Sequence, residues 1–327
     1  MRAVVYERFG PPEVLQVREV PRPTPGDREV LVRIRATTVT SADCRARARD
    51  VPAGYGPVAY LVFGFFRPRQ PILGAEFAGE VAAVGKEVRE FSVGDPVFGF
   101  TDAAMGCYAE YRCIPADGKL ARKPGNLSYA EAAALTFGGT TALHYLRKAR
   151  VQRGERVLVN GASGAVGNAC VQLARHFGAE VTGVCSTANV EMVKASGAAH
   201  VVDYSQADFT QNGRTYDVIV DTVGTAPFSR CSASLGERGR LVLILASLPD
   251  MLRAPWISMT GKKKVIVGVA LGRPADVRFL GTLAEAGGFK PVIDRRYPLS
   301  QIVEAHRYVD TGRKKGNVVV TLDDGHA

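Results

Sequence analysis

The sequence lacks any apolar run long enough to cross a membrane. None of its hydrophobic stretches reaches the ~18 residues that a transmembrane helix needs. Its first ten residues, MRAVVYERFG, also lack the apolar segment of a secretory signal peptide. Hydrophobic residues make up 46% of the chain and charged residues 23%, values typical of globular proteins. We therefore expect a cytoplasmic protein with no membrane span.

Cysteine is scarce, and its spacing excludes the common cysteine-based frameworks. No C-x-x-C pair is present to indicate a structural zinc or a disulfide network. In a reducing compartment such cysteines act as small, buried apolar residues. We expect this of all six: Cys44, Cys107, Cys113, Cys170, Cys185 and Cys231.

The sequence also lacks a concentrated basic region. Its net charge is +10, from 42 Lys and Arg against 32 Asp and Glu, but these residues are spread along the chain. Only 262–264 and 313–315 form short basic clusters. Nucleic-acid-binding proteins gather their basic residues on one face or helix, so this spread disfavours a nucleic-acid partner. It fits a solvated surface, or one that attracts an anionic cofactor.

The residue composition and the predicted secondary structure change near residue 125. The preceding residues form short extended segments separated by Pro and Gly, as in a mostly β domain. Beyond that point, Ser128 and Glu131 have the spacing of a capping box, and the Ala-rich run 131–149 has helical composition. A helix is therefore predicted to lead into a second domain.

Six strand-like Val/Ile/Leu segments alternate with helical segments between residues 156 and 270. This pattern predicts an α/β fold, a doubly wound parallel six-stranded Rossmann sheet. Two helical segments and a closing strand then most simply return to the first domain. With 327 residues exceeding the usual size of one core, we expect a mostly β domain from 1–124 and 273–327, and a dinucleotide-binding domain from 125–272.

A run of small residues, NGASGAVGN at 160–168, separates a strand-like segment from a helical one. A phosphate-binding loop has this place, because free N–H groups and the helix dipole meet the pyrophosphate there. Gly164 would let the backbone approach the phosphates, and Gly167 would let the helix pack on the strand. Ala162 then stands at the first glycine of the usual motif. The loop predicts a dinucleotide, although small residues also serve ordinary tight turns.

The residues after the second strand, EVTGVC at 180–185, indicate which dinucleotide binds. NAD enzymes usually place Asp or Glu at the end of this strand to hold the ribose 2′-hydroxyl, and no acid stands there. The side chains of Ser186, Thr187, Asn189 and Lys194 would instead accept a 2′-phosphate. NADPH is therefore favoured, with NADH as the alternative. An ordinary Ser/Thr/Asn helix cap would also explain these residues.

Nearly the whole chain resembles the medium-chain dehydrogenase/reductase superfamily, in its zinc-free quinone oxidoreductase and enone reductase branch. The resemblance is carried by LGAEFAGEVAAVG, VGDPVFGF, NGASGAVG, HVVDY, VDTVG and KKGNVVVTL. It implies that the mostly β domain is GroES-like and catalytic. It also implies further cofactor contacts by Thr141, Ser163, Ala165, Val166, Tyr204, Val223 and Asn317.

The same resemblance implies that the chain holds no metal. Thr40 and Ala75 stand where zinc alcohol dehydrogenases have a Cys and a His ligand, and Cys44 lies on the wrong side of Asp43 to substitute. Two departures from the branch alter the site. Thr40 replaces an Asn found in many relatives, and Ala188 replaces an Arg that is the natural partner of a 2′-phosphate.

Without a metal, such an enzyme can still deliver hydride to a small, hydrophobic acceptor that is already electrophilic. A quinone or the β-carbon of an α,β-unsaturated carbonyl fits this description. Thr40, Asp43 and Tyr60 are expected to line the substrate pocket, although Asp43 could equally be the structural partner of an Arg. No residue pattern identifies the proton donor, and water could supply the proton.

Two rival functions stay open. One is an enoyl reductase that acts on thioester-bound acyl chains in a biosynthetic pathway. The other is a nucleotide-binding sensor or RNA-binding protein with little catalysis. The aromatic segment 54–71 fits a substrate wall and a packing surface equally, with membrane-surface association a third alternative. In relatives the sixth strand pairs across a dimer, and its counterpart at 264–270 has alternating β-branched residues, so we expect a homodimer.

Overall fold

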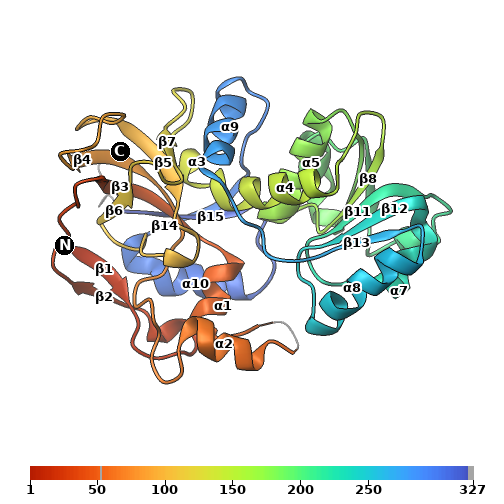
Figure 1. The fold of residues 1–327 in the computed structure, drawn as a ribbon, viewed down its shortest axis with the longest axis horizontal. Helices are drawn as coiled ribbons and strands as arrows, with labels where there is room; N and C mark the ends of the chain where they lie inside the picture. The colour runs from red at the N-terminus through yellow and green to blue at the C-terminus, as the bar shows by residue number, and fades with distance from the viewer. Residues whose placement is uncertain (52–53, 323–327) are drawn as a thin grey trace. The chain divides into compact units, whose positions relative to one another are not determined.

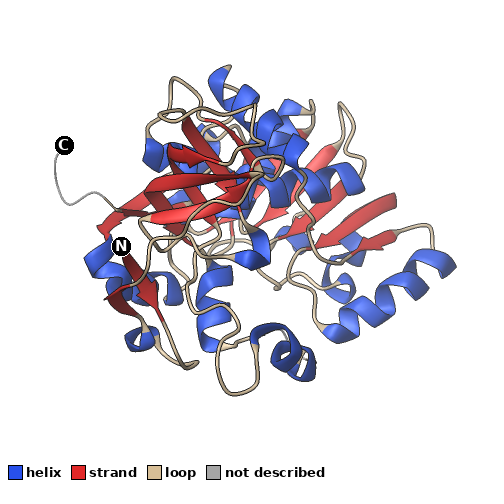
Figure 2. Ribbon diagram, turned by 60° about the vertical axis from the view of Figure 1, so that its left-hand side comes forward, coloured by secondary structure: helices blue, strands red, loops and turns tan. Residues whose placement is uncertain are grey.

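The computed structural model describes residues 1–51 and 54–322, drawn in Figures 1 and 2. The described chain divides into two compact units. The first contains residues 1–51, 56–137 and 272–322, and the second contains 54–55 and 138–271. The composition changes near residue 125, whereas the chain leaves the first unit inside a helix that begins at Thr136.

The first unit is built on a mostly antiparallel sheet of seven strands. The strands lie in the order β14-β15-β3-β4-β5-β7, and β6 pairs with β3 off this path. The closing strand β15 runs antiparallel to β3, with Val319 opposite Thr38, so the end of the chain completes the sheet. The strands are β3 (Glu29–Val39), β4 (Glu76–Val84), β5 (Pro96–Phe100), β6 (Tyr111–Pro115), β7 (Leu120–Arg122), β14 (Ile293–Pro298) and β15 (Asn317–Thr321).

Smaller elements cover this sheet. A two-stranded ribbon pairs β1 (Arg2–Val5) with β2 (Gln16–Glu19). The helices are α1 (Ser41–Ala48), α2 (Gly56–Phe63), α3 (Tyr129–Ala133), α9 (Pro274–Glu285) and α10 (Ile302–Asp310), with short 3₁₀ helices η1 (Pro12–Val14), η2 (Asp102–Ala104) and η6 (Leu299–Gln301). Both helical segments predicted after residue 272 are thus formed, as α9 and α10.

The Ala-rich run after Ser128 forms two helices where the sequence suggested one. The predicted capping box is present, because the Ser128 hydroxyl accepts from the N–H of Glu131 while the Glu131 carboxylate accepts from the N–H of Ser128. α3 then ends at Ala133, and α4 (Thr136–Lys148) begins. Within α4, a Cβ at Gly138 would lie 2.7 Å from the carbonyl oxygen of Ala165, so this glycine permits a close approach of two backbones.

The second unit confirms the predicted doubly wound sheet. All its strands pair in parallel, and their order is β10-β9-β8-β11-β12-β13. Numbered along the chain, this is the 3-2-1-4-5-6 order of a Rossmann fold. The strands are β8 (Arg156–Asn160), β9 (Glu180–Cys185), β10 (His200–Asp203), β11 (Tyr216–Asp221), β12 (Leu235–Leu243) and β13 (Lys264–Ile266).

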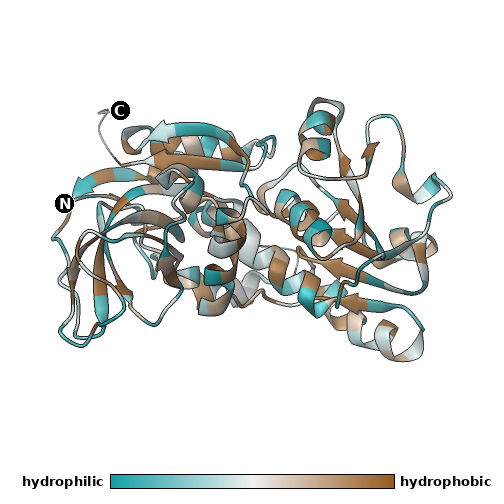
Figure 3. Ribbon diagram, turned by 90° about the horizontal axis from the view of Figure 1, so that it is seen from above, coloured by the Kyte–Doolittle hydropathy of each residue, from teal (hydrophilic) through white to brown (hydrophobic). Residues whose placement is uncertain are grey.

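The inner strands β8, β9 and β11 are largely buried and rich in apolar residues, drawn in brown in Figure 3, whereas the edge strands β10 and β13 are only partly buried. The connections contain α5 (Ala165–His176), α6 (Val190–Ala195), α7 (Phe228–Cys231) and α8 (Leu248–Thr260), with 3₁₀ helices η3 (Thr187–Asn189), η4 (Phe209–Gln211) and η5 (Ser232–Ser234). Gly178 and Gly197, which follow α5 and α6, both have positive φ, of 82° and 103°, a conformation that ends many helices.

The edge strand β13 is shorter than the 264–270 expected from the sequence. It ends at Ile266, and its outer edge is partly occupied by the same chain. The hydroxyl of Ser258 on α8 accepts from the N–H of Val265, at 3.0 Å, and lies 3.4 Å from the Val265 carbonyl oxygen. An edge that bonds to its own helix is a poorer template for a partner strand.

All six cysteines are free thiols, and all except the partly exposed Cys113 are buried. No helix in the described ranges is long and apolar enough to span a membrane.

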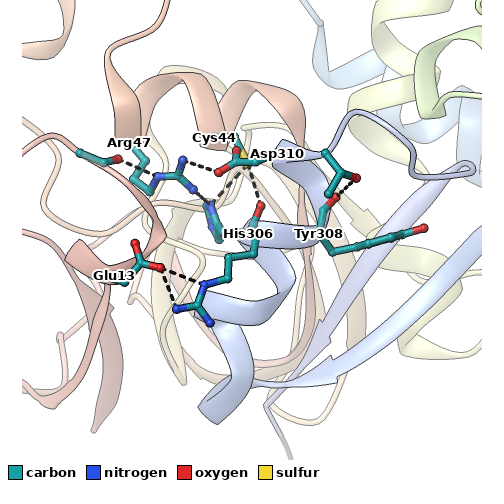
Figure 4. Close-up of polar contacts among 9 residues, drawn as sticks. Glu13, Cys44, Arg47, His306, Tyr308 and Asp310 are labelled. Atoms are coloured by element: carbon teal, nitrogen blue, oxygen red, sulfur yellow. Dashed lines mark hydrogen bonds and ion pairs between the residues drawn. The ribbon is translucent and has the colours of Figure 1, made fainter.

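α1 is held against α10 by a buried polar cluster (Figure 4). One guanidinium nitrogen of Arg47 donates to Nδ1 of His306 at 3.0 Å, and another pairs with Asp310 at 2.7 Å. The Cys44 thiol lies 3.4 Å from the same Nδ1, and the ring of Tyr108 packs edge-on against the imidazole. Since an arginine can only donate, Nδ1 of His306 is an acceptor and the ring is neutral.

Burial, with a smaller contribution from the Arg47 charge, lowers the pKa of His306 from 6.5 to about 3. At pH values between about 3 and 6.5, this histidine is protonated in the unfolded chain and neutral in the folded chain. The free energy of unfolding therefore falls as the pH falls through this range. At pH 5 the loss is about 2 kcal/mol for this one group.

We predict that His306→Asn makes the loss of stability between pH 7 and pH 5 smaller by about 2 kcal/mol, because this titration is removed. The Asn oxygen keeps an acceptor for Arg47, although the cavity lowers stability at both pH values. Urea unfolding at the two pH values measures the difference. The exposed His200→Asn is the control and should follow the wild type. An unchanged pH dependence in His306→Asn would show that another group controls it.

Candidate functional site

The loop between β8 and α5 presents an open backbone at a helix N-terminus. Gly164 is the N-cap of α5, and no side chain caps it. The N–H groups of the first turn therefore have no partner from within the helix. A Cβ at Gly164 would meet only the carbonyl oxygen of Gly161, at 3.7 Å, so its backbone can be approached closely. Ser163, Ala165 and Val166 flank this opening.

The tight turn of this loop is made by Gly161, which the sequence interpretation passed over for Ala162. Gly161 has φ of +81°, and a Cβ there would lie 2.5 Å from the Thr222 hydroxyl. Ala162 is buried, and its N–H donates to Val184 of β9. At Gly167 a Cβ would lie 2.0 Å from the Gly161 oxygen, so the helix packs directly on the turn. The three glycine roles therefore belong to Gly161, Gly164 and Gly167.

The sequence interpretation missed Asp221, which organises the neighbouring loop. This buried carboxylate ends β11 and accepts from Nδ2 of Asn160 at 3.0 Å. It also accepts from the N–H groups of Val223, Gly224 and Ala226, at 2.9 to 3.1 Å. These bonds hold the exposed Val223 in the loop after β11, the strand that pairs with β8. The VDTVG motif was the signal, since an Asp at a strand end can bond to N–H groups of the turn that follows it.

The residues predicted to bind the 2′-phosphate follow β9. Ser186 accepts from Nδ2 of Asn189 at 3.1 Å, while Oδ1 of Asn189 is buried with no hydrogen-bond partner in the described chain. Neither side chain caps the following helices, so the alternative interpretation as a simple helix cap is not what the structure has. The Lys194 ammonium pairs with Glu191 at 2.9 Å.

An acid does stand at this edge of the sheet, contributed by the next strand. Asp203 ends β10, and its Oδ2 accepts from the Thr187 hydroxyl at 2.5 Å. Its Oδ1 accepts from the N–H and hydroxyl of Ser205, at 3.0 and 2.6 Å. Tyr204 follows it and is exposed. The sequence motif for a ribose-binding acid refers only to the end of the second strand, so it did not point to Asp203.

These features of the second unit fit a dinucleotide. The uncapped N-terminus of α5 suits a pyrophosphate, and the orphaned Asn189 oxygen lacks a donor that a ligand could supply. The loops after β8, β9, β10 and β11 lie together because parallel strands end at the same edge. Thr141 belongs to the same unit, buried on α4.

In the first unit, Thr40 and Asp43 form the capping box of α1. Oδ2 of Asp43 accepts from the N–H and hydroxyl of Thr40, at 2.8 and 2.6 Å, and Oδ1 accepts from the N–H of Gly74 at 3.1 Å. The structural partners of Asp43 are thus Thr40 and Gly74, where an arginine had been considered. Burial raises the pKa of Asp43, and these hydrogen bonds oppose the rise.

A second buried carboxylate, Glu76, directly follows Ala75 and was not singled out from the sequence. It accepts from the Thr136 hydroxyl at 2.8 Å, from the N–H of Phe137 and from the Thr38 hydroxyl. Burial raises the pKa of Glu76 to about 7, against these hydrogen bonds. In the described part of the chain, no three His, Cys, Asp or Glu side chains are grouped so as to hold a metal ion.

Two other candidate residues of the first unit belong to other elements, α2 and β15. Tyr60 on α2 is partly exposed, and its ring packs against Phe65 and under the Arg49 guanidinium. Asn317 begins β15 and donates to the carbonyl of Val292 at 3.1 Å. Of the predicted cofactor residues, Asn317 alone belongs to the first unit.

Known proteins resemble the chain over nearly its full length. It is 30% identical to the chloroplast envelope quinone oxidoreductase homolog of Arabidopsis thaliana over 338 aligned positions, covering 98% of each chain. It is 31% identical to the 2-methylene-furan-3-one reductase of Solanum lycopersicum, covering 98% of this chain and 79% of that protein. The solved quinone oxidoreductase of Coxiella burnetii superposes with a TM-score of 0.86 at 28% identity, covering 99% of both chains.

Two family descriptions match separate parts of the sequence. Residues 26–125 match the alcohol dehydrogenase GroES-like domain, and residues 196–320 match the zinc-binding dehydrogenase family. Together with the fold and the full-length relatives, these matches identify the chain as an oxidoreductase that belongs to the medium-chain dehydrogenase/reductase superfamily, with its relatives among the quinone oxidoreductases and enone reductases.

Proposed function

We propose that this oxidoreductase is metal-free and transfers hydride from NADPH to a quinone or an α,β-unsaturated carbonyl. The proposal rests on Thr40 and Ala75. By the family resemblance, these residues stand where zinc alcohol dehydrogenases have a Cys and a His ligand. The Thr40 hydroxyl donates to Asp43, and Ala75 offers no ligand atom. An acceptor that is already electrophilic needs no Lewis acid.

The roles of the chain's own residues follow from their chemistry. The N–H groups at the start of α5 would bind the pyrophosphate, and Gly164 allows its close approach. The nicotinamide supplies the hydride. Thr40, Asp43 and Tyr60 are proposed to line the acceptor pocket, with Asp43 fixing the start of α1 through its bonds to Thr40 and Gly74. Water is proposed to deliver the proton.

The names of the relatives support the two acceptor classes. The relatives include quinone oxidoreductases and a 2-methylene-furan-3-one reductase, whose substrate is an unsaturated ketone. The chain also shares its fold with enoyl reductases. Activity on thioesters alone would therefore replace the proposed quinone or enone acceptor with a thioester-bound acyl chain.

We predict that the purified protein oxidises NADPH with simple quinones or enones and keeps its full rate after exhaustive dialysis against a chelator. Absorbance at the nicotinamide band measures the rate, and elemental analysis should find no stoichiometric zinc. The reason is that neither the Thr40 hydroxyl, which donates to Asp43, nor the Ala75 methyl group replaces a Cys or His ligand of zinc. Loss of activity that only zinc restores would contradict the metal-free mechanism, and activity on thioesters alone would select an enoyl reductase.

NADPH is proposed over NADH because the second strand ends in Cys185 and is followed by hydroxyl and amide side chains. We predict that Ala188→Arg strengthens the preference for NADPH by about 1–2 kcal/mol, the range of a charge-assisted contact with the 2′-phosphate. Fluorescence titration with both nucleotides measures the ratio of dissociation constants. Ala188→Gln is the matched control, which adds length without charge. An unchanged ratio in Ala188→Arg would place the 2′-phosphate elsewhere.

We also propose a homodimer, formed through an apolar face of the second unit. Leu252, Trp256 and Met259 lie at helical spacing on α8, with 72%, 70% and 85% of their surfaces exposed. Val269 and Leu271, which follow β13, are exposed as well. Large apolar side chains exposed at helical spacing, as on α8, indicate an interaction surface. A second copy of the chain would cover it through two-fold symmetry.

We predict that Trp256→Glu shifts the protein from dimer to monomer, because it buries a charge in the proposed interface. Sedimentation velocity at micromolar concentration measures the change. Trp256 is also the single tryptophan, so its emission in the wild type should shift to the blue as concentration rises. The control Val93→Glu changes an exposed apolar residue of the first unit. A monomeric wild type would contradict the proposed assembly.

A further inference from the structure

Asp203 lies where the second and third strands of the Rossmann sheet end side by side. β9 and β10 pair in parallel, with Asp203 opposite Cys185. Residues that follow one strand therefore neighbour residues that follow the other. This brings the Asp203 carboxylate to the hydroxyl of Thr187, 16 residues earlier in the chain, at 2.5 Å.

The carboxylate is fixed in place and ionised. The N–H and hydroxyl of Ser205 donate to one oxygen, and Thr187 donates to the other. Hydrogen bonds from Ser205, then from Thr187, hold the pKa of Asp203 below its usual value. A negative charge therefore stands beside the group of residues expected to receive a 2′-phosphate.

Two consequences follow for an anion bound there. The Thr187 hydroxyl has one proton, and a phosphate can receive it only if Asp203 loses it. The phosphate would also bring a charge of about −1.5 to −2 close to the carboxylate, and like charges at such range repel. Lys194, the one cation among the residues predicted to bind the 2′-phosphate, offers limited compensation because it is already paired with Glu191.

We propose that Asp203 is a specificity-determining residue that opposes binding of the 2′-phosphate and so limits the preference for NADPH over NADH. It places a negative charge at the end of the third strand, whereas NAD enzymes usually carry an acid at the end of the second. This inference rests on the proposed function only in placing the adenosine ribose at the ends of β9 and β10.

The test uses Asp203→Asn, which removes the charge and keeps the shape. Adenosine 2′,5′-bisphosphate and 5′-AMP are the probes, because they carry the adenosine half of NADPH and NADH without the nicotinamide. Isothermal titration calorimetry of the full-length protein measures both affinities. We expect the bisphosphate to bind about tenfold more tightly and 5′-AMP to change less than about twofold. The gain should shrink in 1 M salt, where exposed charges are screened.

Asp208→Asn is the matched control. Asp208 accepts from the N–H and hydroxyl of Thr210, both at 2.9 Å, in the same arrangement that Asp203 has with Ser205. Its substitution changes the net charge by the same amount without touching the residues after β9. Both affinities should stay at the wild-type level. If Asp203→Asn fails to fold by circular dichroism, Asp203→Ser repeats the test.

The outcomes separate this inference from the proposed function. The role of Asp203 is overturned if the ratio of the bisphosphate affinity to the 5′-AMP affinity is unchanged in Asp203→Asn and Asp203→Ser. It is also overturned if Asp208→Asn gains as much affinity for the bisphosphate. Either result leaves the proposed function untouched. A wild type that binds neither probe contradicts both the inference and the nucleotide site. A shifted ratio in a protein that reduces neither quinones nor enones supports the inference and rejects the proposed acceptors.

Discussion

The candidate cofactor site depends on one close contact between two pieces of backbone. α5 starts directly over the turn that leaves β8, and a single carbon added at Gly167 would lie 2.0 Å from the Gly161 oxygen. Gly161 itself needs a positive φ of 81°. Because β8 is central in the sheet, this contact places the open N-terminus of α5 beside the loops after both neighbouring strands, β9 and β11.

The features that the sequence predicted correctly are those with local causes. The capping box of Ser128 and Glu131 involves residues only three apart in the chain. The six strands follow from runs of Val, Ile and Leu, and parallel pairing with helical connections then leaves few topologies. The motif has Ala162 at its first glycine position, whereas the tight turn is made by the neighbouring Gly161 through its positive φ.

The missed residues acquire their roles through strand pairing. Asp203 meets Thr187 only because β10 lies beside β9, and Asp221 meets Asn160 only because β11 lies beside β8. Glu76 similarly bonds to groups 38 and 60 residues away in the chain. No local periodicity carries such information. A sequence can show that an acid ends a strand, but the partner depends on which strand lies next to it.

The structural carboxylates Asp43 and Asp221 are buried, whereas Asp203, which we propose opposes the 2′-phosphate, is only partly buried. The donors to Asp221 are an amide and three backbone N–H groups, and Asp43 is likewise held by a hydroxyl and two backbone N–H groups. Such neutral donors shape the backbone without bringing a cation to it. The charges expected near the ribose are those of Asp203, which is partly exposed, and of the exposed Lys194–Glu191 pair. Because the loop at Gly161 and Gly167 does not depend on them, the nucleotide preference can change while the fold of the site persists.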